Sequence, residues 1–174
     1  MSSDGYVECG VSEYRDICNR FVEAFVFRPS YDWQGWPSIR EPSPSVTWGL
    51  SAILLDPVED APEGKKLDQL GAVIQRGLAA CALPEMWLYS VDWYHSAVRF
   101  RPDPVGGLGQ PRWPGSAFPD GDYYVYFSED FSFGTFGHPW EGTLCVFGAG
   151  LLAQVTEDLT AVLGNPRRRD GRGL

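Results

Sequence analysis

The residues of this sequence best suited to acid–base chemistry are its histidines and the carboxylates close to them. The chain has two histidines: His95 follows Asp92 by three positions, and His138 precedes Glu141 by three. A carboxylate that hydrogen-bonds an imidazole fixes its tautomer and shifts its pKa toward neutral pH. The predicted catalytic residues are therefore His138, Glu141, His95 and Asp92. In this prediction His138 is the base, and Glu141 or Asp122 orients its ring.

Each of these residues also has a purely structural interpretation. Asp92 and Asp120 can cap turns, and both imidazoles can hydrogen-bond nearby backbone groups. Two histidines with one aspartate also match the ligand set of a facial metal triad, but no spacing in the sequence supports one. We therefore expect no metal site and no cofactor.

Aromatic residues are dense in the same half of the chain and indicate a binding site. The segment Tyr123–Phe127 reads as a strand that is aromatic on both faces. Either both faces are covered, or one of them lines a pocket or an interface. Asp120 and Asp122 form a turn just before this strand, and Arg99 follows His95 by four positions. The predicted ligand-binding residues are Arg99, Asp120, Asp122, Trp93, Tyr124 and Trp140.

A glycine motif late in the chain fits the pattern of a dinucleotide-binding loop. The run Gly148-Ala149-Gly150-Leu151-Leu152-Ala153 matches G-x-G-x-x-A between an expected strand and an expected helix. Such a loop also needs a second strand that carries an acidic residue, and only 21 residues follow Ala153. We therefore interpret these glycines as a tight turn from strand to helix.

Three stretches place apolar residues at steps of three and four, which is the period of an amphipathic helix. Ser12 is the expected cap of the first. The second stops before Pro84, because the residue before a proline avoids helical backbone. The third is terminated by Gly164-Asn165-Pro166. Their ranges are Val11–Phe25, Leu67–Cys81 and Leu151–Val162.

Strand patterns fill most of the remaining chain, with few helices between them. Strands without intervening helices favour an antiparallel sheet. We therefore predict an α+β fold, with a mostly antiparallel sheet of about five to six strands and three helices packed on one face of it. Residues 1–164 form a single domain in this prediction, and residues 165–174 form an Arg-rich flexible tail. The expected strands are Ser45–Leu55, Met86–Trp93, Ala97–Phe100, Tyr123–Phe127, Phe131–Phe136 and Thr143–Phe147.

The charge balance argues against nucleic acid as a partner. The chain has 14 basic and 23 acidic residues, for a net charge of −9. Residues 165–174 contain four arginines and one aspartate, a balance of +3, so residues 1–164 carry −12. A body this acidic repels phosphate backbones. We expect a small molecule or a protein as the partner.

Secretion and membrane insertion are not expected. The segment Met1–Gly5 is acidic and lacks the basic and apolar parts of a signal peptide. The longest purely apolar run lies around Ala52–Leu55, which is far shorter than a membrane span. The four cysteines include no C-x-x-C pair, so free thiols in the cytoplasm are the simplest interpretation.

Several short segments of the chain occur together in a defined order. They are Trp36-Pro37, Glu41–Trp48, Asp92–His95, Arg99–Pro102, Pro119–Tyr124, Gly134–Trp140 and Thr143–Gly148. This set resembles an uncharacterised bacterial family, the domain of unknown function 2716, which is frequent in actinobacteria. The likeness covers most of Phe27–Leu152. It implies that the family pattern includes Asp92, His95, Arg99, Asp120, Asp122, His138 and Trp140.

The resemblance implies a small soluble bacterial protein and brings no established activity. Actinobacterial genomes place many small proteins in specialised-metabolite clusters, so by analogy we expect a role there. The first functional hypothesis is an aromatic-lined pocket that binds a small neutral or cationic metabolite and converts it by acid–base chemistry. The alternative is a protein-binding module, either an accessory subunit of a larger enzyme or an immunity protein that covers a toxin. A concave polar pocket favours the first hypothesis, and a flat patch of exposed Trp and Tyr favours the second.

Overall fold

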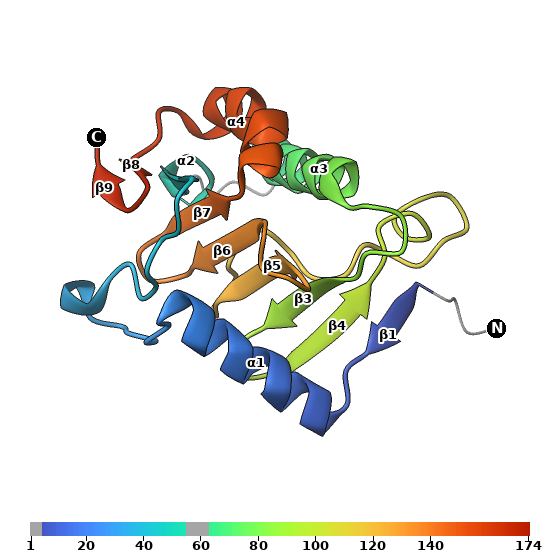
Figure 1. Cartoon of the computed structure of the whole chain (residues 1–174). Coiled ribbons are helices and arrows are strands. Elements are labelled where there is room, and N and C mark those ends of the chain that lie inside the picture. The colour runs from blue at the N-terminus through green and yellow to red at the C-terminus, as the bar shows by residue number, and fades with distance from the viewer. Residues whose placement is uncertain (1–4, 55–62) are drawn as a thin grey trace.

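One antiparallel sheet runs through the described part of the chain, residues 5–54 and 63–174 (Figure 1). The strands of this computed structural model are β1 (Tyr6–Glu8), β2 (Ser45–Gly49), β3 (Leu88–Asp92), β4 (Ser96–Phe100), β5 (Tyr124–Ser128), β6 (Gly134–His138), β7 (Thr143–Phe147), β8 (Arg168–Arg169) and β9 (Arg172–Gly173). Their order across the sheet is β1-β4-β3-β5-β6-β7-β2-β8-β9, and every neighbouring pair is antiparallel. The predicted α+β class and antiparallel sheet are confirmed, with more strands than predicted.

The described residues also contain four α-helices and one short 3-10 turn. They are α1 (Val11–Phe25), η1 (Trp33–Gly35), α2 (Ser51–Leu54), α3 (Glu63–Cys81) and α4 (Ala149–Leu163). Three of the helices coincide with the predicted ones, and the short α2 is additional. Helix α1 begins after Gly10 without a side-chain cap, so the predicted cap by Ser12 is wrong. The helix ends where Val26 adopts left-handed backbone, with φ 52°.

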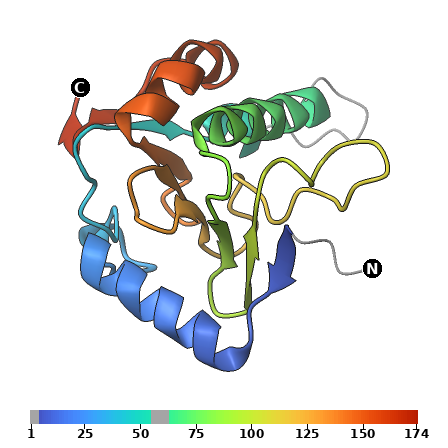
Figure 2. The same ribbon diagram turned by 45° about the vertical axis from the view of Figure 1, so that its right-hand side comes forward.

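The helices cover both faces of the sheet, and not one face as predicted (Figure 1; Figure 2). Helix α1 packs on one face over an aromatic core in which Phe21 contacts Phe127 and Phe136. Helices α3 and α4 pack against each other on the opposite face, over a mainly aliphatic core. The aromatic residues on the two sides of β5 are explained by this arrangement, because each side faces a core. Phe127 faces α1, whereas Tyr126 belongs to the core under α3.

The strand predicted over Ser45–Leu55 is shorter in the structure. Strand β2 ends at Gly49, and helix α2 follows it. The N–H of Leu50 makes a last bond in register with β7, to the carbonyl of Gly142 at 2.8 Å, and the chain then turns into α2. Residue 55 lies outside the described residues.

The strand predicted over Phe131–Phe136 begins later than expected, at Gly134. A turn held by Asp130 occupies the first part of that segment. Its Oδ1 accepts hydrogen bonds from the hydroxyls of Ser128 and Ser132, both at 2.7 Å. These local bonds compete with strand pairing and delay the start of β6.

Residues 168–173 form the last two strands of the sheet, where the sequence predicts a flexible tail. Strand β8 pairs with β2, opposite the side of β2 that pairs with β7. Arg168 holds it there, because its guanidinium lies 2.8 Å from the carboxylate of Glu41 and 2.6 Å from that of Glu141. The basic end of the chain therefore folds back onto buried carboxylates of the acidic body.

The glycine motif forms the tight turn from β7 into α4, as predicted. Gly148 has φ 97°, a conformation that residues with a Cβ rarely adopt. A Cβ at this position would lie 2.6 Å from the carbonyl oxygen of Ser132. The turn therefore needs glycine for both its backbone angle and its close packing.

Two further expectations concern the cysteines and the membrane-spanning helices. All four cysteines are free. Within residues 5–54 and 63–174, no helix combines the length and the apolar character that a membrane span requires.

Candidate functional site

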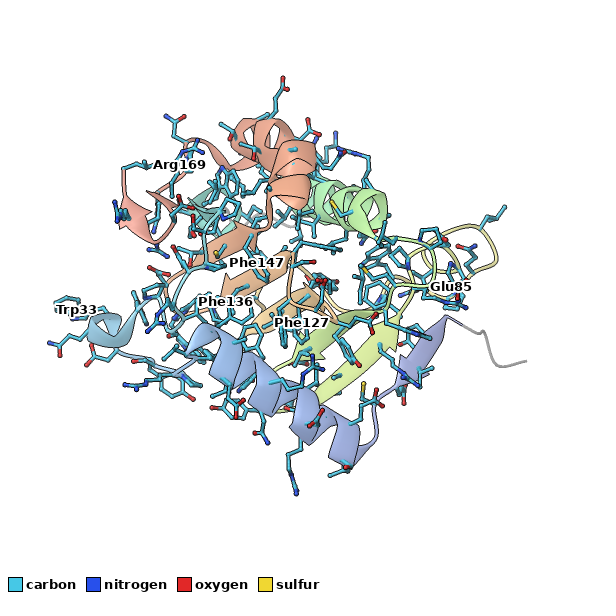
Figure 3. All side chains as sticks on the ribbon, in the orientation of Figure 1. Trp33, Glu85, Phe127, Phe136, Phe147 and Arg169 are labelled. Carbon is cyan, nitrogen blue, oxygen red and sulfur yellow. The ribbon has the colours of Figure 1, made fainter. Side chains whose placement is uncertain are left out.

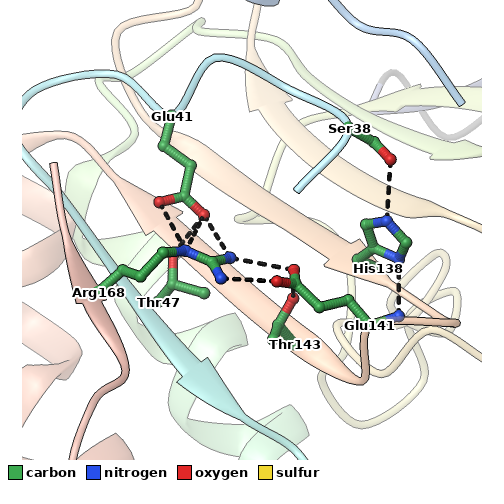
Figure 4. A network of polar contacts seen from close by, with 7 residues as sticks. All are labelled: Ser38, Glu41, Thr47, His138, Glu141, Thr143 and Arg168. Carbon is green, nitrogen blue, oxygen red and sulfur yellow. Dashed lines mark hydrogen bonds and ion pairs between the residues drawn. The ribbon is translucent and has the colours of Figure 1, made fainter. Parts of the chain in front are cut away.

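His138 is fully buried at the end of β6, and both of its ring nitrogens have partners (Figure 4). Nε2 lies 2.9 Å from Oγ of Ser38, and Nδ1 accepts a hydrogen bond from the backbone N–H of Glu141 at 3.1 Å. Because that N–H can only donate, Nε2 of the neutral ring carries the proton and donates it to Ser38. Burial lowers the pKa of His138 to about 4, which keeps the ring neutral.

The carboxylate of Glu141 belongs to a separate network, centred on Arg168 (Figure 4). The guanidinium bridges two carboxylates: Nη1 donates to Glu141 at 2.6 Å, and Nη2 donates to Glu41 at 2.8 Å. Thr143 donates to Glu141 at 2.7 Å, and Thr47 donates to Glu41 at 2.9 Å. Burial raises the pKa of Glu141, but the bonds from Arg168 and Thr143 outweigh it and hold that pKa below its ordinary value.

His138 and Glu141 therefore do not form the predicted acid–base pair. A general base needs a free lone pair directed at its substrate, and both nitrogens of His138 are engaged inside the protein. The rings of Tyr123 and Trp36 pack against the imidazole, with centroids 4.9 Å and 5.4 Å away. The arrangement supports the sheet and the loop before β2, and offers no proton acceptor. Asp122, the other predicted partner of His138, lies beside His95.

His95, Asp92 and Asp122 come together where β3 ends and β5 begins. Nδ1 of His95 lies 2.9 Å from Oδ1 of Asp92 and 3.6 Å from Oδ2 of Asp122. The register explains this meeting, because Asp92 pairs with Tyr124 and Asp122 precedes that residue by two positions. The hydrogen bond to Asp92 raises the pKa of His95, and burial raises the pKa of Asp122. The predicted pair of Asp92 and His95 is thus in contact.

A groove passes beside this cluster, on the face of the sheet that α3 covers. It consists of two adjoining cavities of about 560 Å³ and 440 Å³, whose walls share Ser116 and Tyr124. The larger cavity lies over β1, β3 and β4, and the smaller one lies between α3 and the segment around Phe118. Asp92 lines the larger cavity and accepts a hydrogen bond from the Tyr124 hydroxyl at 3.4 Å. We call these two cavities the acidic groove.

The walls of the acidic groove combine carboxylates, hydroxyls and apolar surface. Among its described lining residues, none is Lys, Arg or His. Carboxylates come from Glu8, Asp68, Asp92 and Asp120, hydroxyls from Ser90, Ser96 and Ser116, and apolar walls from Tyr6, Leu67 and Phe118. Volumes of this size are common for metabolite sites. The electrostatic character of the lining favours a positively charged ligand.

Three of the predicted ligand-binding residues lie away from the groove. Trp93 is 6% exposed and is part of the aromatic core beneath α1. Arg99 pairs with Glu13 of α1 at 3.5 Å. Trp140 packs against Tyr123, with ring centroids 5.1 Å apart. These residues hold the aromatic layer together and do not reach the groove.

Two of the predicted ligand-binding residues, Asp120 and Tyr124, line the acidic groove, and most of its other lining residues were not predicted. Ser90 precedes Asp92 by two positions in β3, so strand alternation alone would place it on the same face. No local sequence pattern marks Asp68 or Ser116 as a residue of the groove. Helix α3 and the loop before β5 bring them to the groove by tertiary packing.

Comparison with known proteins gives two matches. A family described as "Protein of unknown function (DUF2716)" matches residues 9–152. The "Uncharacterized protein YxiI" of Bacillus subtilis (strain 168) is 40% identical over 74 residues, which are 41% of this chain and 44% of that protein. The matched part therefore spans less than half of that relative. No solved structure matches the chain.

Proposed function

This chain belongs to the DUF2716 family, and we propose that it binds a small organic cation in the acidic groove. The observation that carries the proposal is the charge of the groove walls. Four carboxylates line them, and no basic side chain is among the described lining residues. Carboxylates without a counter-charge in the same walls create a potential that attracts cations and repels anions. A cationic ligand fits this surface better than a neutral one.

Tyr124 is the centre of the proposed site, because it lines both cavities. Its ring offers a face for cation–π contact. Its hydroxyl donates to Oδ2 of Asp92 at 3.4 Å and so orients that carboxylate. Burial raises the pKa of Tyr124, which keeps the hydroxyl protonated. Aromatic and carboxylate recognition of an organic ammonium group are thereby combined in one place.

Conversion of the bound cation by acid–base chemistry stays a prediction. Of the two predicted pairs, Asp92 and His95 are in contact at 2.9 Å, and Asp92 also lines the groove. The hydrogen bond to Asp92 raises the pKa of His95, and a histidine paired with a carboxylate is a common proton-transfer group. This pair takes the place of His138 and Glu141 as the proposed acid–base group.

Isothermal titration calorimetry with choline, putrescine and spermidine tests the binding proposal. The protein is untagged and treated with a chelator, and glycerol and succinate serve as neutral and anionic comparators. We expect at least one cation to bind and neither comparator to do so. The double variant Asp68→Asn/Asp120→Asn, which leaves Asp92 intact, should weaken that binding by at least about tenfold, because contacts to charged groups are strong.

Asp16→Asn is the matched control for this experiment. Asp16 is exposed on α1, on the opposite face of the sheet, so its loss should leave binding unchanged. Failure of all three cations to bind would contradict the proposal. So would a double variant that binds as well as the unmodified protein.

A second candidate function, protein binding, rests on a different surface. Tyr31 and Trp33 are 75% and 70% exposed on the loop before β2, and Figure 3 shows Trp33 pointing away from the body of the protein. The loop is anchored, because Tyr31 packs against Trp140 with ring centroids 4.2 Å apart and the N–H of Ser30 donates to the Tyr123 hydroxyl at 2.9 Å. Exposed aromatic side chains on a rigid support are typical of binding hot spots.

Site-specific crosslinking tests this second candidate. The photocrosslinker p-benzoylphenylalanine replaces Trp33 in one variant and Leu108, a fully exposed residue elsewhere on the surface, in the control. Because the chain carries net charge −9, we expect a positively charged protein to be crosslinked at position 33 and not at position 108. The absence of a crosslink, or equal crosslinks at both positions, would count against protein binding by this loop.

A further inference from the structure

The cluster of Asp92, His95 and Asp122 brings three metal-ligating side chains to one point beside the acidic groove. One ligand atom from each residue lies within 4.8 Å of the other two. Asp92 ends β3, His95 lies in the turn to β4, and Asp122 lies just before β5, so three separate backbone positions converge. Two carboxylates and an imidazole are donors that divalent transition metals accept.

The distances within the cluster fit the ligands of a single ion. Nδ1 of His95 is 2.9 Å from Oδ1 of Asp92 and 3.6 Å from Oδ2 of Asp122. Ions such as Zn²⁺ hold nitrogen and oxygen ligands at about 2.0 to 2.2 Å, which separates neighbouring ligand atoms by about 3 to 3.5 Å. Both distances from Nδ1 are close to this separation, and the three ligand atoms lie within 4.8 Å of one another.

Asp122 supplies a second observation, because one of its oxygens has no hydrogen-bond donor among the described residues. The residue is 9% exposed. Its Oδ1 accepts from the N–H of Tyr123 at 2.7 Å, whereas Oδ2 faces His95 at 3.6 Å, which is too long for a hydrogen bond. Oδ2 of Asp122 therefore keeps lone pairs that a cation beside His95 can use.

Groups outside the cluster hold both carboxylates in orientation. Tyr124 donates to Oδ2 of Asp92 at 3.4 Å, and the N–H of Tyr123 donates to Oδ1 of Asp122. Each carboxylate therefore has one oxygen fixed from outside and the other directed at His95. The backbone N–H of His95 donates to the carbonyl of Asp92 at 3.0 Å and fixes the turn. Outer contacts of this kind orient the ligands of metal sites.

From this geometry we propose that Asp92, His95 and Asp122 bind one divalent transition-metal ion. The side chain of His95 is 64% exposed, so the remaining coordination positions of the ion are open to water or to a ligand. The proposal goes beyond cation binding in the acidic groove and does not rest on it. It is an alternative to the acid–base role of Asp92 and His95, because both roles use Nδ1 of His95 and Oδ1 of Asp92. The ion uses Oδ1 of Asp92, whereas Oδ2 faces Tyr124 in the groove.

Titration of untagged, chelator-treated protein with Zn²⁺ and Co²⁺, followed by calorimetry, tests the proposal. We expect one equivalent of either ion to bind, at least about tenfold more tightly than Mg²⁺, because imidazole favours transition metals. His95→Gln and Asp122→Asn should each weaken Zn²⁺ binding by at least about tenfold. Asp16→Asn is the matched control, because Asp16 is an exposed carboxylate on α1, outside both the cluster and the groove, and this variant should bind Zn²⁺ unchanged.

Two results would overturn the metal site. One is no Zn²⁺ binding, or binding that survives His95→Gln, a change at an exposed residue that leaves the core intact. The other is a sulfur-to-cobalt charge-transfer band in the Co²⁺ spectrum, which would place the ion on a thiol such as that of Cys9, a lining residue of the groove. Because organic cations are titrated in chelator-treated protein, failure of the metal site leaves the test of the groove unaffected.

Discussion

The backbone N–H of Glu141 donates to Nδ1 of His138 at 3.1 Å, while the carboxylate of the same residue pairs with Arg168 at 2.6 Å. One residue thus serves two networks through different groups. The amide fixes the neutral tautomer of a buried imidazole, and the carboxylate is one of two that bind a largely buried guanidinium. The first interaction lies within the turn between β6 and β7, and the second ties that turn to β8, so their effects can be measured separately.

The first prediction concerns stability at acidic pH. The pKa of His138 is lowered by burial to about 4, against an ordinary value of 6.5. The unfolded chain therefore takes up a proton at this residue before the folded chain does. Its contribution to stability is complete above pH 6.5 and is lost as the pH falls toward 4, by about 3 kcal/mol in total. Urea denaturation at pH 7 and pH 4.5 measures the change.

His138→Gln isolates this effect from the titration of carboxylates. The variant lacks the ionisable ring, so its free energy of unfolding should fall by about 2 to 3 kcal/mol less than that of the unmodified protein between the two pH values. Equal losses in both proteins would show that His138 does not control acid stability. The ring resonances of His138 in NMR spectra provide a direct reading of its pKa.

The second prediction concerns the Arg168 network. Arg168→Met leaves the carboxylates of Glu41 and Glu141 buried without their cation, with side chains 1% and 10% exposed. We expect the free energy of unfolding to fall by about 3 to 5 kcal/mol. Arg169→Ala, at the exposed neighbouring position, should change it by less than about 0.5 kcal/mol. Similar effects of the two substitutions would show that the hairpin, and not the ion pairs, provides the stability.

The third prediction concerns the charge on His95. The hydrogen bond that His95 donates to Asp92 is the main cause of its raised pKa. Asp92→Asn in chelator-treated protein should therefore lower the pKa of His95 toward its ordinary value. NMR titration of the ring protons measures the shift, and Glu129→Gln, an exposed carboxylate outside the cluster, should leave it unchanged. An unmoved pKa in the Asp92 variant would place the cause elsewhere.

The fourth prediction concerns the contact between α3 and α4. A Cβ at Gly77 would lie 2.4 Å from Cγ1 of Val155 and 2.9 Å from Cδ1 of Leu151. Gly77→Ala should destabilise the protein by about 1 to 3 kcal/mol, because the helices must move apart. Gly71→Ala in the same helix meets nothing closer than 3.9 Å and should be stabilising by up to about 1 kcal/mol. Thermal unfolding of the two variants compares them directly. A change of melting temperature in the same direction in both variants would contradict the packing argument.

Local patterns account for the elements that the sequence predicts correctly. Helix α1 was predicted with its observed bounds, because Ile17, Phe21 and Phe25 form one buried stripe at helical spacing. Strands β8 and β9 escaped prediction for the opposite reason. They depend on an ion pair between Arg168 and Glu41, which are 127 positions apart. No local pattern contains that information, and an arginine run alone is typical of a solvated end.

In the candidate site, too, local contacts could be predicted from the sequence and long-range ones could not. Asp92 and His95 are three positions apart and meet across a turn, so their contact could be predicted. His138 and Glu141 have the same spacing and also meet, but through the backbone amide of Glu141. Spacing predicts proximity and does not say which group of a residue is used. Arg168 binds the carboxylate of Glu141, so the backbone amide is the group that contacts His138. The position of Arg168 in turn depends on the whole sheet.

The strand order also has a consequence for how the chain reaches its native state. Neighbouring strands from β3 to β7 lie mostly close in sequence, whereas β2 joins β7 through pairs such as Trp48 with Leu144, 96 positions apart. Closing so long a loop costs more entropy than closing a hairpin, and non-local pairing slows folding. We therefore expect the part of the sheet built from β3 to β7 to form early and the edge built by β2, β8 and β9 to form late. The half of the sheet that carries Asp92 and His95 is then in place before Arg168 finds its carboxylates.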